Sequence, residues 1–128
     1  MCIRDSPKMT TDEIGLVVRH ELVHALDDCD GADWKDCRFI VCSELRAYSF
    51  SNCLDGTQWR KGRTREDCIR KGAEASSRGR TACQGVNLTK LIRDLMPTCA
   101  FCPSCGKKPV PPSRCPVDDI KNTNLPEN

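Results

Sequence analysis

Apolar residues recur along the first quarter of the chain with the spacing of an amphipathic helix. This helix is predicted to begin at Thr10 or Thr11, because Thr10 and Glu13 stand three residues apart, as in a capping box. It is predicted to end within residues 28–31, where two aspartates, a cysteine and a glycine give a stop signal. Its apolar stripe consists of Ile14, Val17, Val18, Leu22, Ala25 and Leu26.

Three further helices are predicted downstream, over residues 36–50, 64–77 and 87–96. The stretch from Thr64 opens with a Thr-x-x-Asp cap. The last stretch is predicted to close at Pro97, because a proline lacks the N–H that continues a helix. No strand-rich segment is found, so the predicted fold class is mainly α.

The chain divides into three segments by composition. Residues 1–9 are predicted to be a disordered leader or an artefact of sequence assembly, because they contain no apolar run and fit nothing that follows. Residues 10–99 hold the predicted helices and form the single predicted domain. Residues 100–128 start with proline, glycine, lysine and cysteine and are predicted to be a flexible tail.

Charge and cysteine content narrow the class of protein. With 20 Lys and Arg against 18 Asp and Glu, the net charge is only +2, which gives no reason to expect a nucleic-acid partner. No apolar run approaches the ~20 residues that span a bilayer. The 11 cysteines come close to the level at which a disulfide scaffold in an oxidising compartment is expected. Because the count is odd, at least one cysteine has no partner within the chain.

Both histidines of the chain fall in one motif, His-Glu-Leu-Val-His, at residues 20–24. On a helix, positions i and i+4 share a face, so the His20 and His24 imidazoles can bind one ion. Glu21 lies about 100° further around the helix axis, close to such an ion but not bound to it. The arrangement resembles the zincin peptidases, in which two histidines hold Zn²⁺ and the glutamate acts on the attacking water.

A catalytic zinc site needs a third protein ligand. Glu44 is the first candidate, because the 20 residues that follow His24 let one helix end and a second return toward the metal. Asp27 or Asp28, one turn after His24, is an alternative. Asp30 is a weaker one, because zincins that take this ligand from a short loop have glycine where this chain has Asp27.

Other polar residues are candidates for supporting roles. Asp27 and Asp28 are predicted to orient an imidazole through its second ring nitrogen. Arg46 and Tyr48 on the second helix are candidate donors to a developing oxyanion. Glu21 is the predicted general base, acting on a water whose pKa Zn²⁺ lowers toward ~7.

Residues 19–53 carry several further motifs in the order of a known family. These are His-Glu-Leu-x-His-Ala-x-Asp at 20–27, Asp-Trp-x-x-Cys-Arg at 33–38, Cys-Ser-Glu-x-Arg-Ala at 42–47, and Cys53. A looser similarity continues through Cys68, Cys83 and Cys99. In these residues the chain resembles the mitochondrial inner-membrane metalloproteases of ATP synthase assembly.

The resemblance implies a zincin-like α+β metallopeptidase domain over residues 10–99, with its N-terminal sheet largely absent here. It implies a zinc endopeptidase attached peripherally to the mitochondrial inner membrane, on the intermembrane-space side. Its substrate would be a peptide segment of a membrane protein precursor, an ATP synthase subunit that it processes and helps to assemble. The resemblance also implies disulfide bonds, with the candidates Cys29, Cys37, Cys42, Cys53, Cys68, Cys83 and Cys99.

Two other functions stay open at this point. A non-proteolytic assembly chaperone would keep the zinc site but not depend on Glu21, whereas a metal-free disulfide-rich binding module would bind no zinc. In the tail, Cys102, Cys105 and Cys115 follow Cys99 with spacing that also allows a second metal site. Disulfides within this proline-rich segment are the preferred interpretation.

Overall fold

The computed structural model describes residues 13–53, 64–100 and 114–128. Its elements are α1 (Glu13–Cys29), α2 (Cys37–Phe50), α3 (Arg65–Arg78), the 3-10 turn η2 (Thr81–Cys83), α4 (Leu88–Cys99) and α5 (Val117–Lys121). Over these ranges no strand forms, and the only β pairing is an isolated bridge between Val86 and Glu127. The prediction of a mainly α fold is confirmed.

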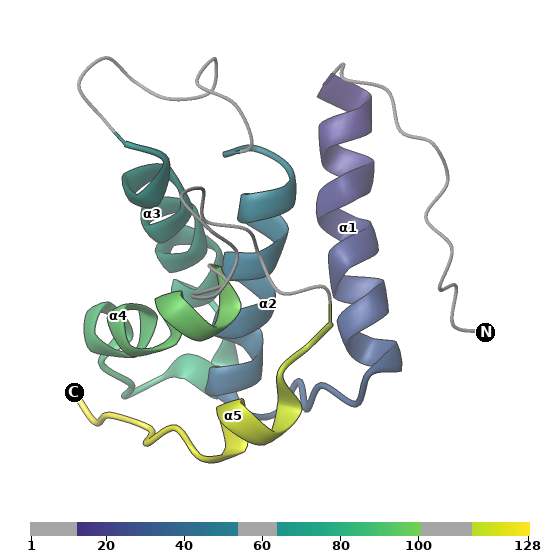
Figure 1. The fold of residues 1–128 in the computed structure, drawn as a ribbon. Helices are drawn as coiled ribbons and strands as arrows, with labels where there is room; N and C mark the ends of the chain where they lie inside the picture. Colours follow the sequence, from purple (N-terminus) through teal and green to yellow (C-terminus); the bar gives the residue numbers. More distant parts are fainter. Residues whose placement is uncertain (1–12, 54–63, 101–113) are drawn as a thin grey trace.

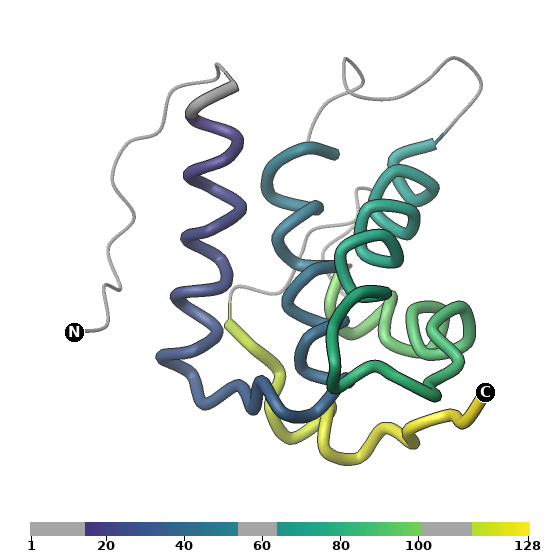
Figure 2. Tube along the Cα trace, turned by 180° about the vertical axis from the view of Figure 1, so that it is seen from behind, coloured from purple at the N-terminus to yellow at the C-terminus, as the bar shows by residue number. Residues whose placement is uncertain are grey.

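Helix α2 lies at the centre of the molecule, with α1 on one side and α3 and α4 on the other (Figure 1). The view from behind shows the same order, with α1 at one edge (Figure 2). A helix with neighbours on both sides is buried all round. The buried residues of α2 are accordingly Cys37, Phe39, Ile40, Val41, Cys42, Ser43, Glu44, Leu45, Arg46, Ala47 and Ser49.

The apolar core lies between α2, α3 and α4. Leu45 of α2, Ile69 of α3 and Leu91 of α4 belong to one cluster and have no exposed surface. Along α4 the buried residues are Leu91, Ile92, Leu95, Met96 and Cys99, which follow helical spacing on one face. Each large apolar side chain buried in this way contributes roughly 1.5–3 kcal/mol.

The apolar stripe predicted for α1 does not face this core. Val17 and Val18 are 61% and 45% exposed, whereas Val23 and Asp27 are buried. The face of α1 that meets α2 instead repeats at positions 20, 23, 24 and 27 and includes both histidines. The prediction was wrong because polar side chains on that face find partners on α2, which the periodicity of apolar residues cannot reveal.

Helix α4 continues through Pro97 to Cys99, so the predicted end at Pro97 was also wrong. A proline removes a single N–H, and the amide of Ala100 still bonds to the carbonyl of Met96 at 2.9 Å. The last turn is also tied to α2 by the disulfide Cys42–Cys99.

Three disulfides connect α2 and the residues after it to the other side of the core. They are Cys37–Cys83, Cys42–Cys99 and Cys53–Cys68, with sequence separations of 46, 57 and 15. The prediction of disulfide-stapled helices is confirmed, and Cys29 is disulfide-bonded as well. Because Cys99 is in a disulfide, it does not serve as a ligand in the alternative tail metal site. Cys102 and Cys105 lie outside the described residues.

Part of the predicted tail packs against the helices. Ile120 of α5 has no exposed surface, and the guanidinium of Arg38 on α2 donates hydrogen bonds to the carbonyls of Lys121 and Thr123, at 3.1 and 2.8 Å. Residues 114–128 are thus held at the end of α2 by long-range contacts that their composition does not show. The predicted segment 1–9 lies outside the described residues, and the domain boundaries stay predictions.

Candidate metal centre between α1 and α2

The two histidines of α1 converge on one glutamate of α2. His20 Nε2 lies 3.3 Å from Glu44 Oε2, and His24 Nε2 lies 3.1 Å from Glu44 Oε1. One ligand atom from each of the three residues can be chosen so that all lie within 4.8 Å of one another. The described ranges contain no second group of three such donors. The sequence-predicted ligand set is therefore brought together at one point.

The electrostatics of Glu44 fit a bound cation. Burial alone would raise the pKa of its carboxyl, but hydrogen bonds from His20 and His24 hold that pKa at about 2. The hydrogen bond to Glu44 in turn raises the pKa of His20, against the effect of burial. Glu44 Oε2 is buried and accepts no well-formed hydrogen bond from the part of the chain that the structure describes. Such an oxygen calls for a cation, and two imidazoles with a carboxylate are a ligand set of catalytic zinc sites.

Two serines of the α2 region contact the other ring nitrogens. Ser43 Oγ lies 2.7 Å from His24 Nδ1, and Ser51 Oγ lies 3.4 Å from His20 Nδ1. Both serines are about 1% exposed. The sequence-based prediction gave this orienting role to aspartates and missed the serines. The available signal was the position of Ser43 directly before the candidate ligand Glu44.

Asp27 and Arg46, both predicted site residues, form a buried ion pair. Arg46 Nε donates to Asp27 Oδ1 at 2.9 Å, and the two side chains are 2% and 0% exposed. Burial raises the pKa of Asp27, and the Arg46 charge opposes that rise. Arg46 Nη1 also donates to the carbonyl of Arg114 at 3.0 Å. The two residues thus lie beside the ligands, and their predicted functional roles stay predictions.

The other candidate aspartates bond to residues outside the candidate ligand group. Asp28 is exposed and accepts a hydrogen bond from the Trp34 indole at 2.9 Å. Asp30 accepts hydrogen bonds from the Arg114 guanidinium and the Cys115 amide. Neither aspartate belongs to the group that could hold an ion. The Asp28 carboxylate therefore connects the end of α1 to Trp34, and the Asp30 carboxylate connects the turn after α1 to the C-terminal segment.

Tyr48 packs against a ligand but uses its hydroxyl elsewhere. Its ring meets the His20 ring edge-on, with centroids 4.8 Å apart. Its hydroxyl lies 2.9 Å from Ser76 Oγ on α3. Gly72 on α3 provides the space for the ring, since a Cβ there would lie 2.6 Å from it. Tyr48 therefore links the ligand helix α1 to α3.

A cleft of about 300 Å³ opens beside the ligands. Glu21, the predicted general base, is exposed and lines this cleft together with His24 and Glu44. Arg80, from the turn after α3, lines it as well and was missed by the sequence-based prediction. No local motif marks Arg80, because only folding brings that turn next to α1. With the described residues, its guanidinium forms no ion pair.

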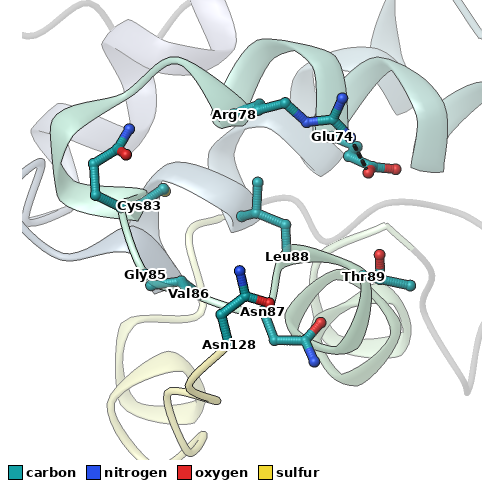
Figure 3. Close-up of a pocket in the computed structure, with 10 residues that line it drawn as sticks. Glu74, Arg78, Cys83, Gly85, Val86, Asn87, Leu88, Thr89 and Asn128 are labelled. Carbon is teal, nitrogen blue, oxygen red and sulfur yellow. Dashed lines mark hydrogen bonds and ion pairs between the residues drawn. The ribbon is translucent and has the colours of Figure 1, made fainter.

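The structure has a second hollow of about 370 Å³ at the C-terminal end of α3. Figure 3 shows Arg78 and Glu74 joined by an ion pair on one wall, with Asn87 and Asn128 on another. The charges on this wall are already paired, and none of the three candidate ligands lines the hollow. Of these two hollows, only the cleft beside α1 is lined by candidate ligands.

A His-x-x-x-His pair on one helix, a glutamate from the next and an exposed glutamate at the cleft define a candidate metallopeptidase centre. The chain belongs to the Peptidase M76 family, whose sequence model matches residues 2–101. The resemblance to the mitochondrial metalloproteases drawn from the motifs is thereby confirmed.

Curated relatives of the chain are also named as proteases. The Mitochondrial inner membrane protease ATP23 of Malassezia globosa is 28% identical over 90 residues, which cover 64% of this chain and 37% of that protein. Those of Sclerotinia sclerotiorum and Botryotinia fuckeliana are each 33% identical over 89 residues, which cover 62% of this chain and 36% of the relative. The match therefore spans little more than a third of each relative. No solved structure matches the chain.

No helix in the described part of the chain is both long and apolar enough to cross a membrane.

Proposed function

We propose that this chain carries the zinc-binding catalytic site of a metalloendopeptidase. The observation that carries the proposal is the convergence of His20, His24 and Glu44 beside a cleft that Glu21 also lines. The burial of Glu44 supports it, because a buried carboxylate oxygen that lacks a hydrogen-bond donor among the described residues is costly without a cation. Membership of a peptidase family supports the same chemistry.

His20, His24 and Glu44 would hold the metal, and Zn²⁺ bound there would supply Lewis acidity and a water of lowered pKa. Glu21 is exposed at the cleft and is not itself in the ligand group, so its carboxylate would be placed to accept a proton from a water in the cleft. The same carboxylate can then pass the proton to the leaving amine.

The cleft also offers groups for an extended peptide. Trp34 and Ile40 supply apolar surface, and Arg80 is the cation on its lining. Arg46 and Tyr48, the donors predicted from sequence, are bonded to Asp27 and Ser76. Arg80 is therefore the residue we propose to donate to the developing oxyanion of the peptide carbonyl.

The proposed substrate is a peptide segment of a membrane protein precursor, an ATP synthase subunit by the family resemblance. The proposed location is the intermembrane-space side of the mitochondrial inner membrane, with peripheral attachment. Relatives named as mitochondrial inner membrane proteases and disulfides of an oxidising compartment support this location. The near balance of charge supports the expectation of no nucleic-acid partner.

The first test is zinc content and cleavage measured on the same oxidised protein, with casein as an unfolded substrate. Wild type is expected to bind one zinc per chain, and His24→Ala and Glu44→Ala to bind none. Glu21→Gln should retain zinc and lose cleavage by roughly 10²–10⁴-fold. Glu66→Gln, an exposed glutamate in the first turn of α3, is the matched control and should retain both.

The outcomes separate the three candidate functions. Zinc that survives in both ligand variants would contradict the assigned site. Stoichiometric zinc without any cleavage by wild type would favour the non-proteolytic assembly chaperone. A wild-type protein that folds with its disulfides and binds no zinc would favour the metal-free binding module.

A further inference from the structure

The Ser43 hydroxyl lies between a candidate ligand and a buried carboxylate. Ser43 Oγ is 2.7 Å from His24 Nδ1. Burial raises the pKa of the Asp27 carboxyl, and Ser43 opposes that rise together with the Arg46 charge, so the Ser43 hydroxyl lies near the Asp27 carboxylate as well. Ser43 and Asp27 are 1% and 0% exposed, so water does not compete strongly for either group. A ligand nitrogen, a hydroxyl and a carboxylate therefore follow one another within the protein interior.

The chemistry of these groups sets the direction of the hydrogen bonds. A histidine that binds a metal through Nε2 must carry its proton on Nδ1, so His24 then donates to Ser43 Oγ. Ser43 has its own proton left to donate. Asp27 Oδ2 is buried and has no well-formed hydrogen bond to a described residue, so it is the acceptor that lacks a donor there. Ser43 thus has a proton to donate, and Asp27 has an oxygen that can accept it.

The far end of this series is fixed by Arg46. Its Nε donates to Asp27 Oδ1 at 2.9 Å, and its Nη1 donates to the carbonyl of Arg114 at 3.0 Å. Asp27 is thereby held with one oxygen toward Arg46. The Asp27–Arg46 ion pair is buried, and neither residue belongs to the group that could hold a metal. Binding of the metal alone therefore gives this pair no role.

We propose that Arg46, Asp27 and Ser43 form a relay of hydrogen bonds that holds His24 with its proton on Nδ1 and Nε2 available to the metal. Ser43 is the positioning residue that touches the ligand, and Asp27 and Arg46 act through it. The proposal rests on the proposed function for the presence of a metal at His24. The relay adds to that function, because it gives the buried Asp27–Arg46 ion pair a role in setting the affinity for the metal.

The two histidines are held unequally. His20 Nδ1 lies 3.4 Å from Ser51 Oγ, and that hydroxyl also contacts the carbonyl of Ala47 at 2.6 Å and Asn52 Oδ1 at 3.0 Å. The His20 contact is longer than the 2.7 Å contact of His24 with Ser43, and Ser51 leads to neutral carbonyl and amide oxygens rather than to a charged pair. The relay therefore predicts a larger effect on metal affinity from the loss of Ser43 than from the loss of Ser51.

The test is the dissociation constant of Zn²⁺ on the full oxidised chain, measured by competition with a chromophoric chelator. Ser43→Ala should weaken zinc binding by roughly 10–100-fold, Ser51→Ala should weaken it less, and Ser43→Thr should restore it because the hydroxyl returns. Ser77→Ala is the matched control, since Ser77 is a buried serine on α3 whose hydroxyl has no hydrogen-bond partner among the described residues. It should bind zinc as wild type does.

A second measurement needs no variant. In wild type loaded with zinc, ¹⁵N spectra of the imidazoles should show the His24 proton on Nδ1. A His24 proton found on Nε2, or Ser43→Ala binding zinc as tightly as wild type, overturns the relay. If zinc binding follows the relay but casein is not cleaved, the proposed peptidase function fails and the relay stands. If wild type binds no zinc, both fail.

Discussion

The two sides of α2 are built from opposite chemistry. Toward α3 and α4, α2 presents apolar residues such as Leu45 and is joined to them by disulfides such as Cys42–Cys99. Toward α1 it presents Ser43, Glu44 and Arg46, which meet histidines and an aspartate. One helix thus serves a stapled core on one side and a polar site on the other.

This contrast indicates what each side contributes. Apolar burial and disulfides stabilise the fold without specific charge partners. Buried charges cost free energy unless they are paired, so the α1 side is expected to add little net stability. Its polar groups are instead arranged for binding. Because α2 is shared, the stapled side holds Glu44 in place while α1 brings the two histidines to it.

The largest expected effect comes from opening the stapled side. Replacing both cysteines of Cys42–Cys99 by serine removes a link across 57 residues, which should lower the free energy of unfolding by about 4 kcal/mol. The pair Cys53–Cys68 closes only 15 residues and should cost about 3 kcal/mol when replaced in the same way. Urea unfolding of both variants checks the order. Equal unfolding free energies for wild type and the first variant would contradict this account.

The polar side can be broken in a way that separates stability from function. Arg46→Met leaves the Asp27 carboxylate buried without its cation and should cost roughly 3 kcal/mol. Replacing both residues, Asp27→Leu with Arg46→Met, should return most of that stability, because two apolar side chains need no partners. Zinc affinity should stay reduced in the double variant. A double variant as unstable as the single one would show that the pair contributes to stability.

Sequence reasoning succeeded where the signal is local. Asp36, Thr64 and Asn87 cap the helices that were predicted to begin there, because capping depends on residues two or three positions away. The candidate ligands His20 and His24 follow from helical spacing, which is also local. Glu44 could be chosen among alternatives because the distance along the chain allowed a second helix to return.

The rest depends on contacts between distant parts of the chain. The buried face of α1 is set by partners on α2 that apolar periodicity does not record, so Val17 was assigned to the wrong face. Residues 114–128 are held by Arg38, although their composition resembles a free tail. Arg80 reaches the cleft only through the packing of α3. These contacts form only in the folded chain, so the local sequence around each residue does not predict them.

A smaller effect is expected where the two sides meet. In a free helix, Gly72→Ala would stabilise by about 1 kcal/mol. Here the added Cβ would lie 2.6 Å from the Tyr48 ring, so the variant should instead lose about 1–2 kcal/mol and shift the ring that packs on His20. Gly79→Ala is the control, because a Cβ there meets nothing within 4 Å. Thermal unfolding measures both variants, and equal melting temperatures would contradict the predicted clash.

The smallest effect concerns the N-terminus of α2 and depends on pH. Asp36 accepts hydrogen bonds from the backbone and side chain of Arg38, which hold the pKa of its carboxyl below the ordinary value. The stability from this lowered pKa is present above the unfolded-state value of about 3.8 and is lost as pH falls through the lower folded-state value. Asp36→Asn retains the cap but removes the charge, so it should cost about 1 kcal/mol at neutral pH.

That difference between wild type and Asp36→Asn should shrink as the pH drops below 4 and vanish once the carboxyl is protonated. Urea unfolding across this pH range measures it, with Asp118→Asn as the control, an exposed aspartate in the first turn of α5. Because Arg38 also holds residues 121 and 123, loosening of the C-terminal segment should accompany the loss, and hydrogen exchange at Asn122 reports it. A constant difference at every pH would mean that the Asp36 charge does not act through Arg38.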